Sequence, residues 1–368
     1  MDDKKYWIGF NFVKGIGSVR LSALLDYFGD LSIAWNAPVE ALVSAGLSQK
    51  IALNLKKVRS SIDLDRIITQ IMEQQITIST WNEPEYPRLL KEIDQSPPVL
   101  YVRGKLSPED EWAVSIVGSR KVTSYGRQVT EELASTLAMN GITVVSGMAR
   151  GIDGIAHRAA INEGGRTIAV LGSGVDRIYP PEHRKLAEDI IQNGAIVSDY
   201  PPNTPPDSVN FPPRNRIISG LSKAVVVVEA GIESGALITA TYAAEQGRDV
   251  LAVPGGIYSP QSKGTNNLIQ QGARPYLDVS DILEILNISQ LESKKTVQTS
   301  FPTDRVELQI IKSISSEAAH IDEIQRITDL PIEQVSSTLT MLELKGWVRQ
   351  TGNMMYISVR EEIAKYGS

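Results

Sequence analysis

The stretch Asn210–Ser222 (NFPPRNRIISGLS) concentrates residue types that can bind an anion. Pro213 suits the first position of a helix, because its ring presets φ and its missing N–H would be unpaired there in any case. Arg214, Asn215 and Arg216 then fall in the first turn, where free backbone N–H groups and the helix dipole favour an anion. Two arginines work against that dipole, and two interpretations explain them. They bind a phosphate, or they pair with carboxylates inside the domain.

Glycine-rich loops follow five apolar runs elsewhere in the chain. They are residues 118–120, 146–153, 172–176, 229–236 and 254–256. Glycine lets a ligand approach the backbone closely, and a loop before a helix presents N–H donors. Because the carboxyl ends of parallel strands meet at one edge of a sheet, we expect these loops to line one site. The arrangement favours a ligand with phosphate or nucleotide groups over loops that merely turn the chain.

The kind of ligand follows from missing motifs and from the neighbouring side chains. Residues 172–174 begin like a dinucleotide fingerprint, but Arg177 stands where its third glycine belongs, and no Gly-x4-Gly-Lys-Ser/Thr motif occurs. Cations interleaved with aromatic rings suit a single nucleic-acid strand. The cations are Arg120, Lys121, Arg150, Arg184, Lys185, Arg214, Arg216 and Lys263, and the rings are Tyr125, Tyr179, Phe211 and Tyr258. For Phe211, ligand contact and ordinary packing remain equal alternatives.

Candidate catalytic side chains are few. His157 follows Asp153 by four residues, which supplies two metal ligands without a third, so we interpret His157 as a packing or loop-orienting residue. Ser234 has no evident histidine partner and is expected to cap a helix. Glu229 and Glu233 are the best candidates for acid–base chemistry near a nucleotide. Glu229 follows a buried run, where its carboxylate can instead hold a neighbouring loop or arginine.

The composition is that of a globular protein with two or three domains. Its 368 residues are 42% hydrophobic and 22% charged, and the net charge of −6 means that a nucleic-acid partner needs a local basic patch. The absence of cysteine removes disulfides, thiolate metal sites and cysteine nucleophiles, and it fits a reducing cytoplasm. The charged start and the lack of a long apolar run predict neither a signal peptide nor a membrane span.

Short apolar runs alternate with helical stretches in the central part, residues 81–287. Val99–Val102 is expected to be the first strand. Six further runs follow at residues 114–117, 142–145, 167–171, 195–197, 224–228 and 250–253. Strands that are apolar on both faces indicate a parallel sheet covered by helices on both sides. We therefore predict an α/β fold with an extended Rossmann-like sheet.

Residues 1–80 are predicted to form a small helical domain of the helix-hairpin-helix or SAM-like kind. Gly15-Ile16-Gly17 makes a turn between two helical stretches. Such a hairpin can offer backbone N–H groups to a DNA phosphate, or it can serve only to pack two helices, and we favour packing. Residues 1–60 hold eight basic and five acidic residues, which is mild support for the phosphate alternative.

The end of the chain is predicted to be a linker, residues 288–304, and a winged helix, residues 305–368. The linker is polar, and the last part shows three amphipathic helices followed by a β-wing. Winged helices commonly bind duplex DNA, which requires cations. Residues 305–358 carry a net charge of −2, and the expected recognition helix carries Glu333 and Glu343 against Lys345. This balance favours a protein-interaction or accessory role.

Across about residues 81–280, the sequence resembles the DprA/Smf family of DNA-processing proteins. The resemblance rests on Tyr86-Pro87, Pro97-Pro98 with Leu100-Tyr101, Gly118-Ser119-Arg120, residues 146–153 with Ala156-His157, residues 172–176 with Tyr179-Pro180, Phe211-Pro212 to Leu221-Ser222, residues 234–240, and Gly264-Thr265-Asn266 with Leu268-Ile269 and Gly272-Ala273. The helical N-terminal part and the winged helix resemble the fuller members. The sequence departs from the family at His183, where an asparagine is usual.

The resemblance implies an extended Rossmann-type domain that binds single-stranded DNA, without nucleotide hydrolysis and without cofactor or metal. It also implies a cytoplasmic homodimer that delivers RecA onto incoming strands during natural transformation. By motif, phosphates would be held by Arg120, by Arg184 and Lys185, and by Arg214 and Arg216. Lys263 would also contribute. The full candidate set is Gly118, Ser119, Arg120, Ser146, Gly147, Arg150, Arg184, Lys185, Phe211, Arg214, Asn215, Arg216, Ser234, Gly235, Lys263 and Asn266.

Two alternatives use the same residues differently. The first is an enzyme or sensor of nucleoside monophosphates, because Glu229, Glu233 and Pro254-Gly255-Gly256 are similar to features of phosphoribohydrolases of related fold. The second is a pure adaptor whose N-terminal domain and winged helix recruit partners. Release of a free base from nucleoside monophosphates would identify the enzyme.

Overall fold

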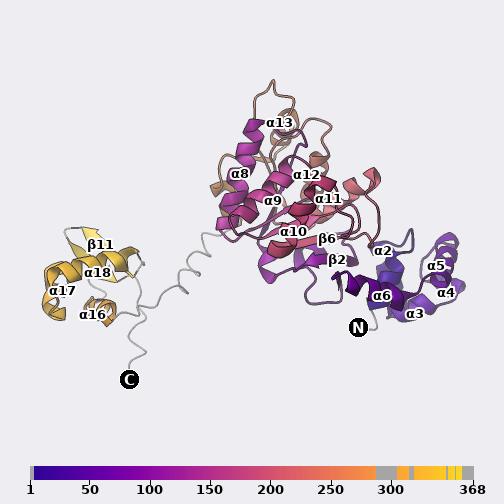
Figure 1. Ribbon diagram of the computed structural model, residues 1–368, viewed down its shortest axis with the longest axis horizontal. Helices are drawn as coiled ribbons and strands as arrows, with labels where there is room; N and C mark the ends of the chain where they lie inside the picture. Colours follow the sequence, from indigo (N-terminus) through magenta and orange to yellow (C-terminus); the bar gives the residue numbers. More distant parts are fainter. Residues whose placement is uncertain (1–3, 287–304, 315–318, 345–346, 353, 359–368) are drawn as a thin grey trace. The chain divides into compact units, whose positions relative to one another are not determined.

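Two compact units make up the chain in the computed structural model. They comprise Met1–Ile288 and Ser289–Ser368 (Figure 1). The structure describes residues 4–286, 305–314, 319–344, 347–352 and 354–358. The predicted linker, residues 288–304, lies outside these described residues.

Within residues 4–286, nine strands form one sheet in the order β1-β2-β6-β5-β4-β3-β7-β8-β9. The strands are β1 (Thr77–Thr80), β2 (Val99–Gly104), β3 (Ala113–Val117), β4 (Thr143–Ser146), β5 (Thr167–Val170), β6 (Gly194–Ser198), β7 (Ala224–Val227), β8 (Asp249–Ala252) and β9 (Arg274–Pro275). From β6 to β9 they are parallel, which confirms the predicted sheet. β1 and β2 add an antiparallel edge, in which Ile78 lies opposite Tyr101.

Helices cover both faces of this sheet. They are α7 (Arg88–Lys91), α8 (Ser124–Met139), α9 (Ile152–Asn162), α10 (Arg184–Asn193), α11 (Phe211–Gly220), α12 (Gly235–Glu245), α13 (Lys263–Gln270) and α14 (Ser280–Ile285), with short 3-10 turns at Pro108–Glu111, Pro181–His183 and Ser208–Asn210. One face of β3 packs Val114 and Ile116 against α8, α9 and α14. The other face packs Val117 with α7, α11 and α12. Burial on both faces explains the uniformly apolar strands.

Six helices precede the sheet, and the first of them packs on its antiparallel edge. They are α1 (Lys4–Asn11), α2 (Ser18–Phe28), α3 (Leu31–Asn36), α4 (Val39–Ser44), α5 (Gln49–Ser61) and α6 (Leu64–Glu73). Trp7 and Phe10 of α1 share a core with Tyr101 of β2 and Ile196 of β6. This helical region matches the predicted one, and the predicted boundary at residue 80 lies inside the first unit.

The second unit is the predicted winged helix. Its elements are α16 (Arg305–Ser313), β10 (Ala319–His320), α17 (Ile321–Thr328), α18 (Ile332–Leu344), β11 (Val348–Gly352) and β12 (Met355–Ser358). Ile310, Leu339 and Trp347 belong to a core of its own, and β10, β12 and β11 form a small sheet. α18 is the helix expected to read DNA, and its sequence contains no lysine, arginine or histidine.

The order of strands in the first unit creates a switch point between β3 and β7. The chain moves outward from β3 to β6, returns to β7 on the opposite side of β3, and continues to β9. The connections after β3 and β7 therefore leave the sheet in opposite directions. In open α/β sheets, ligands bind in the crevice that such a divergence opens beyond the carboxyl ends of the strands.

Candidate nucleic-acid interface

A cleft of about 810 Å³ lies at this switch point, beyond the ends of β3 and β7. Half of the sixteen predicted residues line it: Gly118, Ser119, Arg120, Phe211, Arg214, Asn215, Ser234 and Gly235. The other half lie outside its lining: Ser146, Gly147, Arg150, Arg184, Lys185, Arg216, Lys263 and Asn266. The structure thus brings together the loops after β3 and β7 and the beginning of α11.

The loop after β3 is held by close packing against the start of α9. A β-carbon at Gly118 would lie 2.6 Å from Ile152, and one at Gly151, where φ is +77°, would lie 2.2 Å from the carbonyl oxygen of Ser119. The N–H of Ile152 donates to that same carbonyl at 3.2 Å. Only glycine fits these positions. The packing fixes the backbone that carries Arg120, whose exposed side chain lines the cleft.

Two arginine side chains lie close to the aromatic ring of Phe211. The guanidinium carbons of Arg120 and Arg214 each lie 6.0 Å from its centroid, and the ring of Tyr179 lies 5.8 Å away at 30°. A β-carbon at Gly172 would lie 2.8 Å from Phe211, so the ring also packs on the backbone. Phe211 is half-buried and lines the cleft. Ring and cations together form a surface on which a base and its phosphate can be held.

Arg214, next to this ring, is almost fully buried. Its guanidinium donates to the carbonyls of Gly147, at 2.9 Å, and Val170. A β-carbon at Gly147 would lie 2.7 Å from the guanidinium and 2.9 Å from the carboxylate of Asp153. Burial lowers the pKa of Arg214 to about 10, against the opposing effect of Asp153. Arg214 therefore stays cationic at neutral pH, and it both braces the loop after β4 and places positive charge at the cleft wall.

Asp153 organises the same loop from the first turn of α9. Its carboxylate accepts from the N–H groups of Gly147 and Ala149, each at 3.2 Å. Burial raises the pKa of Asp153, while Arg214 acts in the opposite direction. Sequence reasoning treated Asp153 only as a possible metal ligand. The structure instead shows Asp153 bonded to the backbone of this loop, with its charge acting on the nearby buried Arg214.

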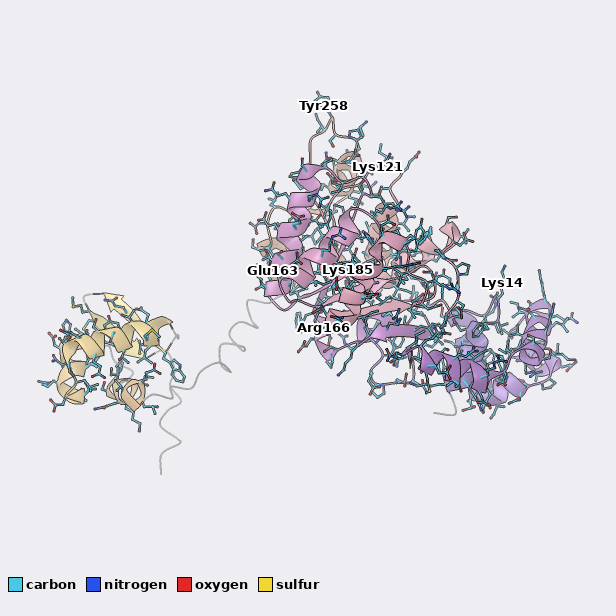
Figure 2. The ribbon with its side chains drawn as sticks, viewed as in Figure 1. Lys14, Lys121, Glu163, Arg166, Lys185 and Tyr258 are labelled. Carbon is cyan, nitrogen blue, oxygen red and sulfur yellow. The ribbon has the colours of Figure 1, made fainter. Side chains whose placement is uncertain are left out.

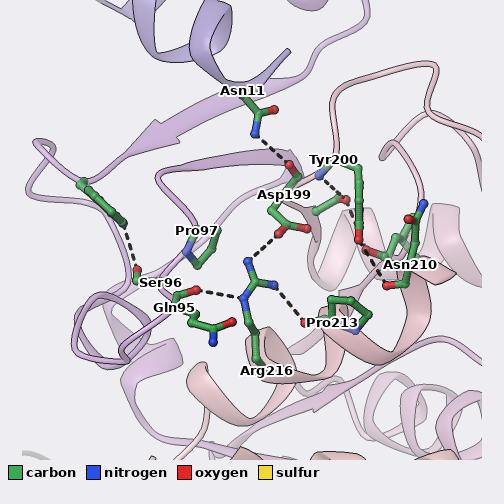
Figure 3. A network of polar contacts seen from close by, with 12 residues as sticks. Asn11, Gln95, Ser96, Pro97, Asp199, Tyr200, Asn210, Pro213 and Arg216 are labelled. Carbon is green, nitrogen blue, oxygen red and sulfur yellow. Dashed lines mark hydrogen bonds and ion pairs between the residues drawn. The ribbon is translucent and has the colours of Figure 1, made fainter. Parts of the chain in front are cut away.

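Arg216 of α11 is absent from the cleft lining and instead belongs to a network of polar contacts (Figure 3). It donates to the carboxylate of Asp199 at 2.7 Å, to the carbonyl of Gln95 at 2.9 Å and to that of Pro213 at 3.0 Å. The side chains of Arg216 and Asp199 are only 13% and 16% exposed. Burial alone would lower the pKa of Arg216, but Asp199, Tyr200 and Tyr86 together raise it overall. For Arg216, the structure shows the internal carboxylate pairing that was the alternative to phosphate binding.

Several other predicted cations lie on the surface beyond the cleft lining. Arg150 pairs with Glu182. Arg184 and Lys185 begin α10 and are exposed, and Figure 2 shows Lys185 on this helix. Lys121, the neighbour of Arg120, lines the cleft although it was not among the sixteen residues. The sequence had nevertheless placed Lys121 among the cations expected at this edge of the sheet.

The remaining predicted residues shape the cleft wall after β7 or brace nearby loops. Ser234 caps α12, as expected, by accepting from the N–H of Ala236 at 3.3 Å. The amide of Asn215 donates to the carbonyl of Gly235 at 3.2 Å, which ties α11 to α12. Asn266 exchanges two hydrogen bonds with the backbone of Gly255, at 3.0 and 3.2 Å. The hydroxyl of Ser146 is buried and donates to a carbonyl of β3.

The candidate acid–base residues have different surroundings. Glu229 is buried, and its carboxylate accepts from the N–H of Thr123 at 3.0 Å and from the Thr123 hydroxyl. Glu229 thus holds the N-terminus of α8, which is the structural alternative given to it. Glu233 lines the cleft. Within the described part of the chain, no group of three or more His, Asp or Glu side chains could hold a metal ion.

Two family models match the chain. That of DNA recombination-mediator protein A covers residues 77–287, and that of the DprA winged helix domain covers residues 294–354. Protein Smf of Synechocystis is 36% identical over 96% of this chain and 98% of its own length. DNA processing protein DprA of Bacillus subtilis is 39% identical over 72% of this chain and 90% of its own length.

Two solved structures share the fold. DNA processing protein A of Streptococcus pneumoniae has a TM-score of 0.67 at 33% identity, covering 76% of this chain and 97% of that one. The Helicobacter pylori protein, whose structure concerns a unique single-stranded DNA binding mode, has a TM-score of 0.52 at 31% identity. That match covers 58% of this chain and 97% of that one. In the described residues, no helix is long and apolar enough to cross a membrane.

Proposed function

Because the chain belongs to the DprA/Smf family of DNA-processing proteins, we propose that its cleft binds single-stranded DNA independently of sequence. The observation that carries the proposal is the group formed by Arg120, Phe211 and Arg214 at the switch point. A ring with adjoining cations accepts any base and its phosphate, because every base has a flat face and every nucleotide a charge. The relative from Helicobacter pylori is described with a single-stranded DNA binding mode.

The proposal extends to what the bound strand is used for. We propose that the protein acts in the cytoplasm as a homodimer and passes the strand to RecA during recombination of incoming DNA. Binding in this scheme breaks no bond. The engagement of Glu229 with Thr123 supports this part, because it gives one of the two candidate acid–base carboxylates a structural task.

Fluorescence anisotropy of a short labelled single strand tests the cleft. The protein is titrated at several salt concentrations with strands of different base composition. We expect similar affinity for each strand and a log–log salt slope of about −0.7 per phosphate contacted. Unchanged anisotropy at low salt would refute single-strand binding. Release of free base from nucleoside monophosphates would instead support the phosphoribohydrolase-like alternative, for which Glu233 is the candidate acid–base residue in the cleft lining.

A further inference from the structure

A second basic surface lies on the N-terminal helices and is formed by Lys14, Lys50 and Lys57. The amide of Asn54 in α5 donates to the carbonyl of Lys14 at 3.3 Å. A β-carbon at Gly15 would lie 3.4 Å from Ile51, so the loop between α1 and α2 lies directly against α5. Lys50 and Lys57 stand four residues before and three residues after Asn54, which places both on the helix face beside that loop. We call this the hairpin–α5 surface.

The three lysines of the hairpin–α5 surface have no internal anion. All are exposed, and Figure 2 shows Lys14 at the outside of the N-terminal helices. Among the described residues, none of the three forms an ion pair, whereas Lys4 and Lys5 of α1 are paired with Glu83 and Asp65. α5 contains no acidic residue, and two of its basic residues, Lys50 and Lys57, belong to this surface. Clustered, unneutralised cations create a potential that attracts a polyanion.

Arg20 adds to the charge of this surface from the first turn of α2. Its guanidinium donates to the carbonyl of Gly15 at 2.6 Å, which folds the side chain back onto the loop. Gly17 caps α2 without a side-chain hydrogen bond, and the first turn holds no acidic residue. The charge on the loop is therefore positive at both of its ends, at Lys14 and at Arg20.

The side chains around these cations indicate which polyanion fits. Residues 14–20 and α5 contain no aromatic residue, and the exposed apolar side chains nearby are Val19 and Leu53. Sites for single strands combine cations with rings that stack on bases, as the cleft does. A surface with cations alone suits a nucleic acid whose bases are already paired. We propose that the hairpin–α5 surface binds the phosphate backbone of duplex DNA, separately from the single-strand cleft.

The test compares two variants of the full chain on two ligands. In the first variant, Lys14→Ala, Lys50→Ala and Lys57→Ala are combined. The control is Lys56→Ala, an exposed lysine of the same helix two residues from Asn54 and therefore turned away from the loop. The ligands are a labelled duplex of about 20 base pairs and a single strand of equal length, each titrated at several salt concentrations.

The triple variant is expected to lose duplex affinity and to flatten its log–log salt slope by about 3 units, one per phosphate contact. Single-strand affinity and the control variant should match the unmodified protein. The inference is overturned if unmodified protein does not bind the duplex, or if the triple variant binds it with unchanged affinity and slope. Equal losses of affinity for duplex and single strand would also overturn it, because the lysines would then contact the single strand as well. If the cleft proposal is wrong instead, the unmodified protein will not bind the single strand.

Discussion

At the scale of single residues, Arg120 is the cleft cation whose removal isolates a phosphate contact. It is exposed, lines the cleft and carries no structural ion pair among the described residues, so Arg120→Ala should leave the melting temperature unchanged. We expect weaker binding of every single strand and a salt slope reduced by about 0.7. Anisotropy titrations with strands of contrasting base composition measure both quantities.

Arg127→Ala is the matched control for this change. Arg127 is also an exposed arginine, but it pairs with Glu131 on α8 at 3.5 Å and lies outside the cleft lining. The control should bind like the unmodified protein. Weakened binding of only one base composition by Arg120→Ala, with an unaltered salt slope, would contradict a phosphate contact for Arg120.

His157 should make the folded state sensitive to acid. Its Nδ1 lies 2.7 Å from the hydroxyl of Thr167, which itself donates to a carbonyl, so Nδ1 carries the proton. Nε2 is buried and has no partner among the described residues. Burial lowers the pKa of His157 from 6.5 to about 3. Between about pH 3 and pH 6.5, His157 is protonated in the unfolded chain but not in the folded chain. The free energy of unfolding therefore has its full value above pH 6.5 and decreases as the pH falls below it.

The expected loss is about 1.4 kcal/mol per pH unit below pH 6.5, or about 2 kcal/mol at pH 5. Urea denaturation at pH 7.5 and pH 5, followed by tryptophan fluorescence, measures it. His157→Gln removes the titrating group, so the difference between the two pH values should shrink by about that amount. If the free energy of unfolding differs between the two pH values by the same amount in the unmodified protein and in His157→Gln, His157 is not the source of the acid sensitivity.

At the scale of elements, the side chain of Arg216 ties α11 to two other segments, at Gln95 before β2 and at Asp199 after β6. Asp199 follows β6 and also accepts, through its backbone carbonyl, from the amide of Asn11 in α1 at 3.3 Å (Figure 3). Arg216→Ala leaves the partly buried Asp199 carboxylate without its cation, which costs up to about 3–5 kcal/mol. We expect a lower melting temperature with the salt slope of single-strand binding preserved, because Arg216 lies outside the cleft lining.

A double-mutant cycle separates this bracing role from phosphate binding. Arg216→Met combined with Asp199→Asn removes both charges, so the pair should cost much less than the sum of the single changes. Calorimetric melting of the four proteins gives the coupling. If the two effects simply add, Arg216 and Asp199 do not stabilise the fold as a pair.

The difference between Arg216 and Arg120 shows which contacts a sequence can reveal. Strands that are buried on both faces appear in the sequence as uninterrupted apolar runs, which predict the parallel sheet. The glycine-rich loops that follow these runs predict where the cleft lies. β1 escaped prediction because four residues are too few to establish a period of two. Arg216 pairs with a carboxylate seventeen residues away, across a strand-end loop, and no local pattern encodes such a contact.

At the scale of the whole molecule, the two units have separate apolar cores. Among the described residues, the core of the winged helix is formed by residues of its own unit, such as Ile310 and Trp347, and the cores of the first unit are formed by residues before 288. Each should therefore unfold as its own cooperative transition. Truncation after Ile288 is expected to remove one calorimetric transition and to leave the temperature of the other unchanged.

The same truncation tests what the winged helix contributes to DNA binding. α18 has no basic residue, and residues 305–358 carry a net charge of −2, so this unit offers few cations to phosphates. Affinity for single strands and for duplex should therefore be kept after truncation, with unchanged salt slopes, because both predicted contact surfaces lie in the first unit. Anisotropy of the truncated and full-length proteins under identical salt series measures this. A flatter duplex slope after truncation would show that the winged helix contacts phosphates despite its acidic recognition helix.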